Sequence, residues 1–330
     1  MRVNISEVAK KAGVSTATVS RVLNNSPLVS TKTKERVLKI IEKLGYVPNH
    51  VARSLRSRRT GLIATIIPYS AEYVLSFPYF SIFIKEVARR LAEDGYHLLL
   101  TTEEPDDDPI GIYRAFLDRK IVDGFIILDL KEKDERISFL TKAKAKFVVV
   151  GRTKDCRDIP FVDTDNMGGA CEATTYLLEK NCERILFING PEDHSVSIWR
   201  EKGYRAAYER KGLRAENSLI LTGNFREESA YKLVKGFSEA FDAIFTASDL
   251  MAIGALRALK EMNRSVPVIG FDDIPQAQTF SPALSTIRQP IDKVGYEVAN
   301  SIIVYLETGK KVSKVLDVEL IIRESTEVKR

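Results

Sequence analysis

Residues 4–24 read NISEVAKKAGVSTATVSRVLN, a stretch that predicts two short helices joined by a tight turn. Asn4 can cap the first helix, and Glu7 stands at the third helical position, where its side chain can answer that cap. Gly13 ends this helix at a turn that needs a positive backbone φ angle, and Ser15 can cap the second helix. This arrangement is typical of a helix-turn-helix.

A third helix is expected to complete a small all-α domain. It should start near Ser30 and end before Gly45. The apolar residues of the three helices recur at helical spacing and can form one small core, made of Val8, Ala9, Ala12, Val19, Val22, Leu23, Val37, Ile40, Ile41 and Leu44. Residues 1–46 are therefore predicted to form the first domain.

The outer face of the second helix carries small, polar and basic side chains. In a helix-turn-helix, the first residues of this helix meet base edges in the major groove, while caps and basic side chains meet phosphates. We therefore expect DNA contacts from Ser15, Thr16, Ala17, Thr18, Ser20, Arg21 and Asn24. The alternative is a generic three-helix bundle with a basic surface.

Positive charge is concentrated at the start of the chain. Residues 1–59 contain 13 Lys and Arg against 3 Asp and Glu, a net charge of +10, whereas the remaining residues contain 37 against 42, a net charge of −5. Lys and Arg that neutralise phosphates supply most non-specific affinity for nucleic acids. The asymmetry predicts a polyanionic partner for one end only, with a merely solvated basic face as the alternative.

From Gly61 onward, apolar runs alternate with amphipathic stretches, the pattern of βα units with buried parallel strands. The expected strands are LIATIIP, HLLLT, GFIILDL and FVVVG, and then RILFING, LILTG, AIFTA and VPVIGFD. Helices are expected between them, near residues 80–93, 110–119, 198–211, 226–236 and 248–262. The fold class is therefore α/β, with two doubly wound parallel-sheet lobes at about residues 60–162 and 163–288.

The last part of the chain is expected to return to the first lobe. A long helix follows Pro290, and a final strand is predicted near LDVELIIR. By analogy with two-lobed proteins, we assign residues 289–317 to the first lobe and residues 318–330 to the second. Residues 60–330 would then form one ligand-binding and dimerisation domain.

The leader ISEVAKKAGVSTATVSRVLNN, followed by VSTKTKERVLKIIEKLGYVPNHVARSLRSRRTGLI, resembles the LacI/GalR family of bacterial repressors. The likeness covers nearly the whole chain. It implies lobes of the periplasmic-binding-protein type and a cytoplasmic regulator whose affinity for a pseudo-palindromic operator is set by a small effector. It also implies a homodimer, because tetramers in this family rely on a C-terminal leucine heptad and this chain ends in ESTEVKR.

In this family the segment that matches residues 47–59 is a hinge, with a short helix that is ordered when two subunits bind an operator. The resemblance implies that Leu55 enters the minor groove as a wedge. An apolar side chain among arginines suits a wedge better than a solvent-facing linker, although a flexible basic linker with an incidental leucine is the alternative. DNA contacts are expected here from His50, Ala52, Arg53, Leu55 and Arg56.

The candidate ligand contacts follow the predicted strands. In doubly wound lobes the ligand lies at the carboxyl ends of the strands, and the family resemblance points to the same positions. These residues combine aromatic rings with polar groups: Tyr79, Phe80, Arg152, Asp163, His194, Arg200, Phe225, Ser248 and Asp272.

Arg200 and Asp272 are the strongest of these candidates. A guanidinium fork and a carboxylate can jointly hold vicinal hydroxyls, while Phe225 can stack against a ring, so the set predicts a sugar effector. Each residue has a structural alternative. Arg200 can form a salt bridge on a helix surface, Asp272 can cap the next helix, and Phe225 can belong to the core.

One departure from the family pattern bears on the effector. Many members carry an acidic residue after the fourth strand, where this chain has Gly151 and Arg152. An acidic or phosphorylated sugar, a nucleobase or a corepressor-type response therefore remains open.

Enzymatic activity is not expected. The sequence contains no GxGxxG, P-loop, GxSxG or HExxH motif, and its three histidines, at 50, 97 and 194, have no evident triad partners. Cys156, Cys171 and Cys182 show no CxxC spacing, so we expect no disulfide framework, metal site or cofactor.

Export and membrane insertion are not expected either. Charged residues stand where a signal peptide needs an apolar stretch, and no segment approaches the ~18 apolar residues of a membrane span. A periplasmic solute-binding protein shares the two-lobe pattern, but the basic leader opposes that alternative.

Overall fold

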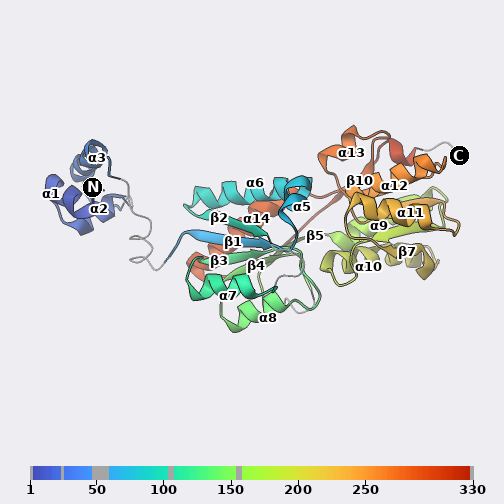
Figure 1. Cartoon of the computed structure of the whole chain (residues 1–330), viewed down its shortest axis with the longest axis horizontal. Coiled ribbons are helices and arrows are strands. Elements are labelled where there is room, and N and C mark those ends of the chain that lie inside the picture. Colours follow the sequence, from blue (N-terminus) through green and yellow to red (C-terminus); the bar gives the residue numbers. More distant parts are fainter. Residues whose placement is uncertain (1–2, 24–25, 47–58, 103–107, 154–157, 328–330) are drawn as a thin grey trace. The chain divides into compact units, whose positions relative to one another are not determined.

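The computed structural model describes residues 3–23, 26–46, 59–102, 108–153 and 158–327, and it divides into two compact units (Figure 1). The first unit is Met1–Thr60 and the second is Gly61–Arg330.

The first unit contains three helices, α1 Ile5–Ala12, α2 Thr16–Leu23 and α3 Thr31–Leu44. Asn4 Oδ1 accepts a hydrogen bond from the Glu7 amide at 3.0 Å, and Ser15 Oγ accepts one from the Thr18 amide at 3.1 Å. Gly13 adopts a φ of 63°, the left-handed conformation that the turn requires. The predicted caps at Asn4 and Ser15 and the predicted turn at Gly13 are confirmed.

The first lobe of the second unit is a six-stranded sheet with the order β11-β5-β4-β3-β1-β2, all parallel. Its strands are β1 Leu62–Ile67, β2 His97–Thr102, β3 Gly124–Ile127, β4 Phe147–Val150, β5 Phe161–Thr164 and β11 Lys314–Leu316. Its helices are α5 Ala71–Ser76, α6 Pro78–Glu93, α7 Gly111–Asp118, α8 Glu135–Lys142 and α14 Ile291–Thr308. One apolar core lies between the sheet and α6 with α14, and another lies on the α7 and α8 side (Figure 1).

The second lobe repeats this design with the strand order β12-β10-β9-β8-β6-β7, in which only β12 is antiparallel to its neighbour. Its strands are β6 Ile185–Asn189, β7 Ile220–Thr222, β8 Ala243–Thr246, β9 Val268–Asp272, β10 Ser285–Arg288 and β12 Glu319–Ile321. Its helices are α9 Asn166–Glu179, α10 Ser195–Arg210, α11 Glu227–Gly236, α12 Asp249–Glu261 and α13 Pro275–Thr279, with 3₁₀ turns η1 Asn217–Leu219 and η2 Glu324–Thr326.

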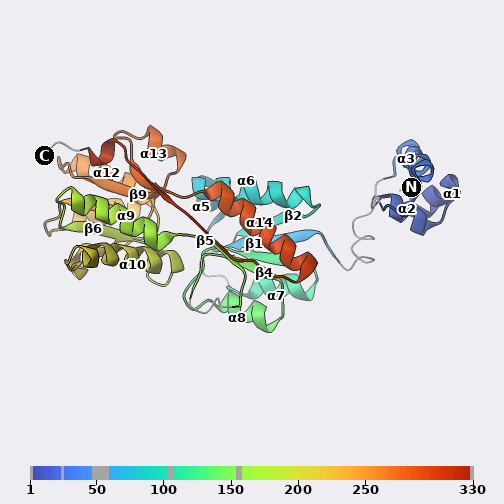
Figure 2. The ribbon, with the colours of Figure 1, turned by 180° about the vertical axis from the view of Figure 1, so that it is seen from behind.

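The chain passes between the two sheets three times, after β5, after β10 and after β11 (Figure 2). The single final strand predicted near LDVELIIR is wrong, because this stretch is divided between β11 in the first sheet and β12 in the second. The division has a physical reason. Val318, between the two strands, packs against the core of the second lobe and draws the chain across.

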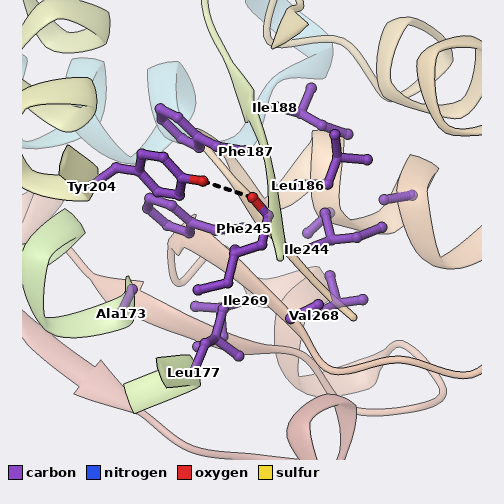
Figure 3. Close-up of a cluster of buried hydrophobic side chains, with 14 of the residues drawn as sticks. Ala173, Leu177, Leu186, Phe187, Ile188, Tyr204, Ile244, Phe245, Val268 and Ile269 are labelled. Atoms are coloured by element: carbon purple, nitrogen blue, oxygen red, sulfur yellow. Dashed lines mark hydrogen bonds between the residues drawn. The ribbon is translucent and has the colours of Figure 1, made fainter. Parts of the chain in front are cut away.

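Stacked aromatic rings form the centre of the second lobe (Figure 3). The ring of Phe187 lies 4.9 Å from that of Phe245 on one side and 4.9 Å from that of Tyr204 on the other. The Tyr204 hydroxyl donates a hydrogen bond of 2.7 Å to the Ile185 carbonyl, drawn as the dashed line in Figure 3. This bond ties α10 to the first residue of β6.

Replacing Tyr204 with Phe should lower the free energy of unfolding of the ligand-binding unit by about 1 kcal/mol, because the ring stacking stays and the buried hydrogen bond is lost. Urea denaturation followed by far-UV circular dichroism measures the change. Tyr296→Phe is the control, since this ring is 38% exposed, and it should leave the midpoint unchanged. Equal midpoints for wild type and Tyr204→Phe would contradict the assignment.

Candidate functional site

A cavity of about 110 Å³ lies between the two lobes, at the carboxyl ends of strands from both sheets. This is the edge at which open α/β sheets bind ligands. Six of the predicted ligand contacts line it: Tyr79, Phe80, Asp163, Arg200, Phe225 and Asp272. The sequence pattern predicted that Asp163 follows a strand, but Asp163 lies within β5.

The other three predicted contacts lie outside the cavity lining. The Arg152 guanidinium pairs with Asp163, with Nε 3.2 Å from Oδ2. The imidazole of His194 has Nε2 3.1 Å from Asp129 Oδ2. Ser248 caps α12, its Oγ accepting a hydrogen bond from the Met251 amide at 3.3 Å. Arg152 and His194 thus each contact a carboxylate that lines the cavity, whereas Ser248 has a local structural role.

Arg200 is buried on α10 and is held from several sides. Its Nε donates to Asn166 Oδ1 at 2.9 Å, its Nη1 donates to the Ala247 carbonyl, and its guanidinium lies 3.8 Å from the Phe271 ring centroid. Burial lowers the pKa of Arg200, while Asp272, whose Oδ1 lies 3.9 Å from Nη2, opposes that change. The alternative of a salt bridge on a helix surface is therefore wrong.

Asp272, at the end of β9, belongs to a chain of hydrogen bonds that reaches both neighbouring crossovers. Gln289 Nε2 donates to Asp272 Oδ1 at 2.7 Å, and Thr164 Oγ1 donates to Gln289 Oε1 at 2.6 Å. The next helix, α13, has Ile274 at its N-cap, so the alternative that Asp272 caps it is wrong. Thr164, Asn166 and Gln289 are not among the predicted contacts, although Thr164 ends β5, Asn166 begins α9 and Gln289 directly follows β10.

The carboxylates of the cavity are poorly hydrated. Burial raises the pKa of Asp163 to about 6, against the opposing effect of Arg152. Burial likewise raises the pKa of Asp272 to about 6, against Arg200 and Gln289. Behind Asp272 lies Asp249, whose pKa is raised by its own burial and then by the charge of Asp272. Such shifts are typical of sites where the protein accepts an electrostatic cost for function.

Aromatic side chains form the wall contributed by the first lobe. Tyr69, Tyr73, Phe77, Tyr79 and Phe80 line the cavity, and neighbouring rings among them lie 5.0 to 6.2 Å apart. Tyr73 lies in α5 and Phe77 directly follows this helix, which the sequence pattern did not reveal. The result is a continuous apolar surface opposite the polar groups of the second lobe.

Phe225 faces this wall from the second lobe. Its position depends on a glycine, because a Cβ atom added at Gly190 would lie 2.0 Å from Phe225 Cζ. The ring is half-buried at the cavity and packs against the core of the second lobe, so the core alternative is correct in part.

Three residues that line the cavity have a backbone conformation that is rare for residues other than glycine. Asp129, Phe225 and Asp272 have φ angles of 55°, 61° and 122°, although residues other than glycine rarely adopt positive values. Gly151 has a φ of 99°, and a Cβ atom there would lie 3.0 Å from Ser195 Oγ of the other lobe. The glycine at the position where the family often has an acid is thus explained by the close approach of the lobes.

The predicted DNA-reading face lies on α2 of the first unit. Ser15, Ala17 and Arg21 are exposed, and Thr16, Thr18 and Ser20 are half-buried. The other predicted contacts lie outside the described residues, at Asn24, His50, Ala52, Arg53, Leu55 and Arg56.

Within the described part of the chain, no group of three His, Cys, Asp or Glu side chains could hold a metal ion. Among the same residues, no helix has both the length and the apolar character needed to cross a membrane.

Two family models match the chain. Residues 4–49 match the bacterial regulatory proteins of the lacI family, and residues 174–326 match a periplasmic binding protein-like domain.

Known proteins are similar over nearly the full length. The HTH-type transcriptional regulator CelR of Thermobifida fusca is 34% identical, with 98% of each chain covered. The structure of a transcriptional regulator CelR–cellobiose complex is 32% identical, with a TM-score of 0.73, and covers 98% of this chain and 100% of that one. The lac repressor dimer bound to operator and the anti-inducer ONPF is 23% identical, with a TM-score of 0.84 and 99% of each chain covered, and this likeness shows the fold alone.

Replacing Asp272 with Asn should stabilise the ligand-binding unit at neutral pH, because burial raises the pKa of this carboxyl and so makes its charged form costly in the folded chain. A carboxyl whose pKa is raised on folding makes stability fall as pH rises between its unfolded value, about 4, and its folded value, about 6. The gain should therefore be complete above about pH 6 and vanish below about pH 4. Thermal unfolding across this range measures it.

The adjacent Asp273 is the matched control with the opposite sign. It accepts hydrogen bonds of 2.7 Å from both Arg288 and Arg323, so Asp273→Asn should destabilise the same unit. Destabilisation by both variants at neutral pH would show that the burial of Asp272 carries no electrostatic cost.

Proposed function

Because the chain belongs to the LacI family of bacterial regulatory proteins, we propose that this transcriptional regulator represses sugar-utilisation genes and releases its operator when a neutral sugar binds between the lobes. The observation that carries this proposal is the cavity itself. An aromatic wall on one lobe faces the Arg200 and Asp272 pair on the other. Rings stack on the apolar faces of sugars, while a guanidinium and a carboxylate bind their hydroxyls.

The charges in the cavity favour a neutral ligand over an anionic one. Three carboxylates line it, those of Asp129, Asp163 and Asp272, against the single guanidinium of Arg200. The sequence pattern allowed an acidic effector because Arg152 follows the fourth strand. In the structure, Arg152 pairs with Asp163 and its guanidinium lies 5.0 Å from the centroid of the Trp199 ring. Both guanidinium groups at the cavity already have a carboxylate partner, Asp163 for Arg152 and Asp272 for Arg200, so a phosphate or carboxylate ligand would compete with these carboxylates.

The size of the cavity bears on the conformation that binds. Its volume of about 110 Å³ lies well below the ~300–1,000 Å³ of pockets for drug-sized ligands. A compact monosaccharide requires the smallest adjustment, and a disaccharide such as the cellobiose held by the CelR structure requires the lobes to move apart. By moving the lobes apart, a ligand in the cavity can affect the rest of the chain.

The helix-turn-helix unit would bind the operator, so its affinity for DNA is the property that the ligand changes. We propose that Thr16, Ala17 and Arg21 contact base edges and phosphates in the major groove of operator DNA, and that Leu55 enters the minor groove. Two copies of the chain would bind the two halves of a pseudo-palindromic operator in the cytoplasm. Coupling between ligand and DNA in such systems amounts to about 1–3 kcal/mol.

The proposal assigns binding and no catalysis. The relatives are transcriptional regulators, and the buried carboxylates of the cavity are accounted for by ligand binding.

Arg21→Ala should weaken binding to DNA from upstream of the regulator's gene by about tenfold, because an exposed guanidinium on α2 is lost. Fluorescence anisotropy with labelled duplex measures the dissociation constant at several salt concentrations. The wild-type protein should show a steep loss of affinity with salt, as expected when phosphates are neutralised. Lys133→Ala, which removes an exposed charge from the other unit, is the control and should bind normally. Salt-independent binding by the wild type would contradict the central proposal.

Arg200→Ala should abolish the effect of the sugar on DNA affinity and leave sugar-free DNA binding intact, because this residue lies in the cavity and not in the helix-turn-helix unit. The sugar is first identified by thermal shift with a panel of monosaccharides, cellobiose, maltose, sugar phosphates and nucleobases. Arg205→Ala is the control on the same helix, since its guanidinium pairs with Glu201 outside the cavity at 2.8 Å. A normal response in Arg200→Ala would place the effector elsewhere, and a response only to phosphates would overturn the neutral ligand.

A further inference from the structure

The two lobes are also joined at the edge of the cavity by a small backbone bridge. The loop after β3 belongs to the first lobe and the loop after β6 belongs to the second. The Glu132 amide donates to the Asp193 carbonyl at 2.8 Å, and the Ser195 amide donates to the Leu130 carbonyl at 2.8 Å. These two bonds bring one histidine of the second lobe against the first.

His194 lies at the centre of this bridge, between carboxylates that belong to different lobes. Its Nε2 is 3.1 Å from Oδ2 of Asp129, which lines the cavity from the first lobe. Its Nδ1 is 2.7 Å from Oδ1 of Asp193, its neighbour in the chain. Asp193 also pairs across the lobes with Lys131, whose Nζ lies 3.1 Å from Oδ2.

Tyr69, Arg136 and Phe225 also lie near His194 and Asp129. Burial raises the pKa of Tyr69 and the charge of Asp129 adds to that effect, while Arg136 Nη2 donates to the Asp129 carbonyl at 2.8 Å. The guanidinium of Arg136 is itself bound to Asp134 at 2.6 Å. On the side of the second lobe, the Phe225 ring meets the imidazole edge-on at 6.2 Å.

We propose that His194, in its protonated form, is a positioning residue that fastens the two lobes together and holds Asp129 at the cavity wall. The donor count carries the argument. An imidazolium donates from both ring nitrogens and satisfies Asp129 and Asp193 at once. A neutral imidazole has one donor, so one carboxylate then faces a nitrogen lone pair.

The direction of the pH dependence follows from the surroundings. Burial alone would lower the pKa of His194, but the hydrogen bonds and charges of Asp129 and then Asp193 outweigh it and raise the pKa. Stabilisation from a group with a raised pKa is present below its unfolded value of about 6.5 and is lost as pH rises through the higher folded value. The contact between the lobes therefore weakens toward alkaline pH. This device acts whether or not the ligand is a sugar.

The chain contains its own reporter of this contact. Trp199 is the single tryptophan of the sequence. It lies on α10 of the second lobe, and its Nε1 donates to the Arg152 carbonyl of the first lobe at 3.0 Å. Separation of the lobes breaks this bond and exposes the indole to a neutral quencher such as acrylamide.

The test is acrylamide quenching of the full-length protein, without any sugar, between about pH 6 and about pH 10. For the wild type, the quenching constant should rise by about twofold as pH increases, as the population with separated lobes grows. His194→Gln and Asp129→Asn should show the higher constant at every pH. His97→Gln, at an exposed site at the start of β2, is the control and should follow the wild type.

One further variant distinguishes the titration of His194 from that of Asp163, a second group near the indole. Asp163 bonds to Arg152 next to the indole, and burial raises the pKa of Asp163 to about 6. Asp163→Asn should retain the alkaline transition, because that transition belongs to His194.

Two results would overturn the proposal. One is a wild-type quenching constant that does not change over the whole range, which needs no variant and so no assumption about folding. The other is a transition retained in His194→Gln with a native circular dichroism spectrum. Because no sugar is present, failure here is distinct from failure of the proposed effector.

Discussion

The carboxylate of Asp272 is buried at the end of β9, where Gln289 donates to it at 2.7 Å and Arg200 lies 3.9 Å away. Removing a charge from water costs several kcal/mol, and the ion pair with Arg200, at 3.9 Å, offsets only part of this desolvation energy. Asp249 directly behind it adds repulsion. The arrangement is therefore poor as a source of stability and well suited to binding, because ligand hydroxyls can supply the hydrogen bonds that the protein leaves unmade.

The Asp272 carboxylate is linked by hydrogen bonds to residues outside the second lobe. Through Gln289 it reaches Thr164, and these two residues lie in two of the three segments that connect the lobes. In the proposed mechanism, a ligand that rearranges the hydrogen bonds of Asp272 would therefore act on the segments that connect the lobes. Coupling between sites needs an element with two arrangements that both sites bias, and the paired lobes with their shared crossovers supply one.

Much of this structure could be predicted from local sequence patterns, and the rest depends on contacts between distant segments. The caps at Asn4 and Ser15 are confirmed because capping involves only neighbouring residues. Arg200 and Asp272 could be placed near the ligand edge because the ends of parallel strands meet there. Tyr79 and Phe80 could be placed there too, but Tyr69, Tyr73 and Phe77 could not, since α5 is too short to show a helical period. The hydrogen bonds from the Glu132 amide to the Asp193 carbonyl and from the Ser195 amide to the Leu130 carbonyl have no signal in the sequence either, because their partners are distant in the chain.

The two lobes are held together by specific contacts rather than by a shared apolar core. Each lobe buries its own apolar cluster, so opening the cavity exposes little of either core. Besides Leu250 of α12, which packs against the core of the first lobe, the described contacts between the lobes are polar or involve a charge: the bridge at His194, the Trp199 bond to the Arg152 carbonyl, and the Arg226 guanidinium over the Tyr73 ring at 4.2 Å. Such contacts contribute little individually and respond to charge and solvent. A small ligand or a single proton can therefore shift the balance between two arrangements, which a continuous apolar interface would resist.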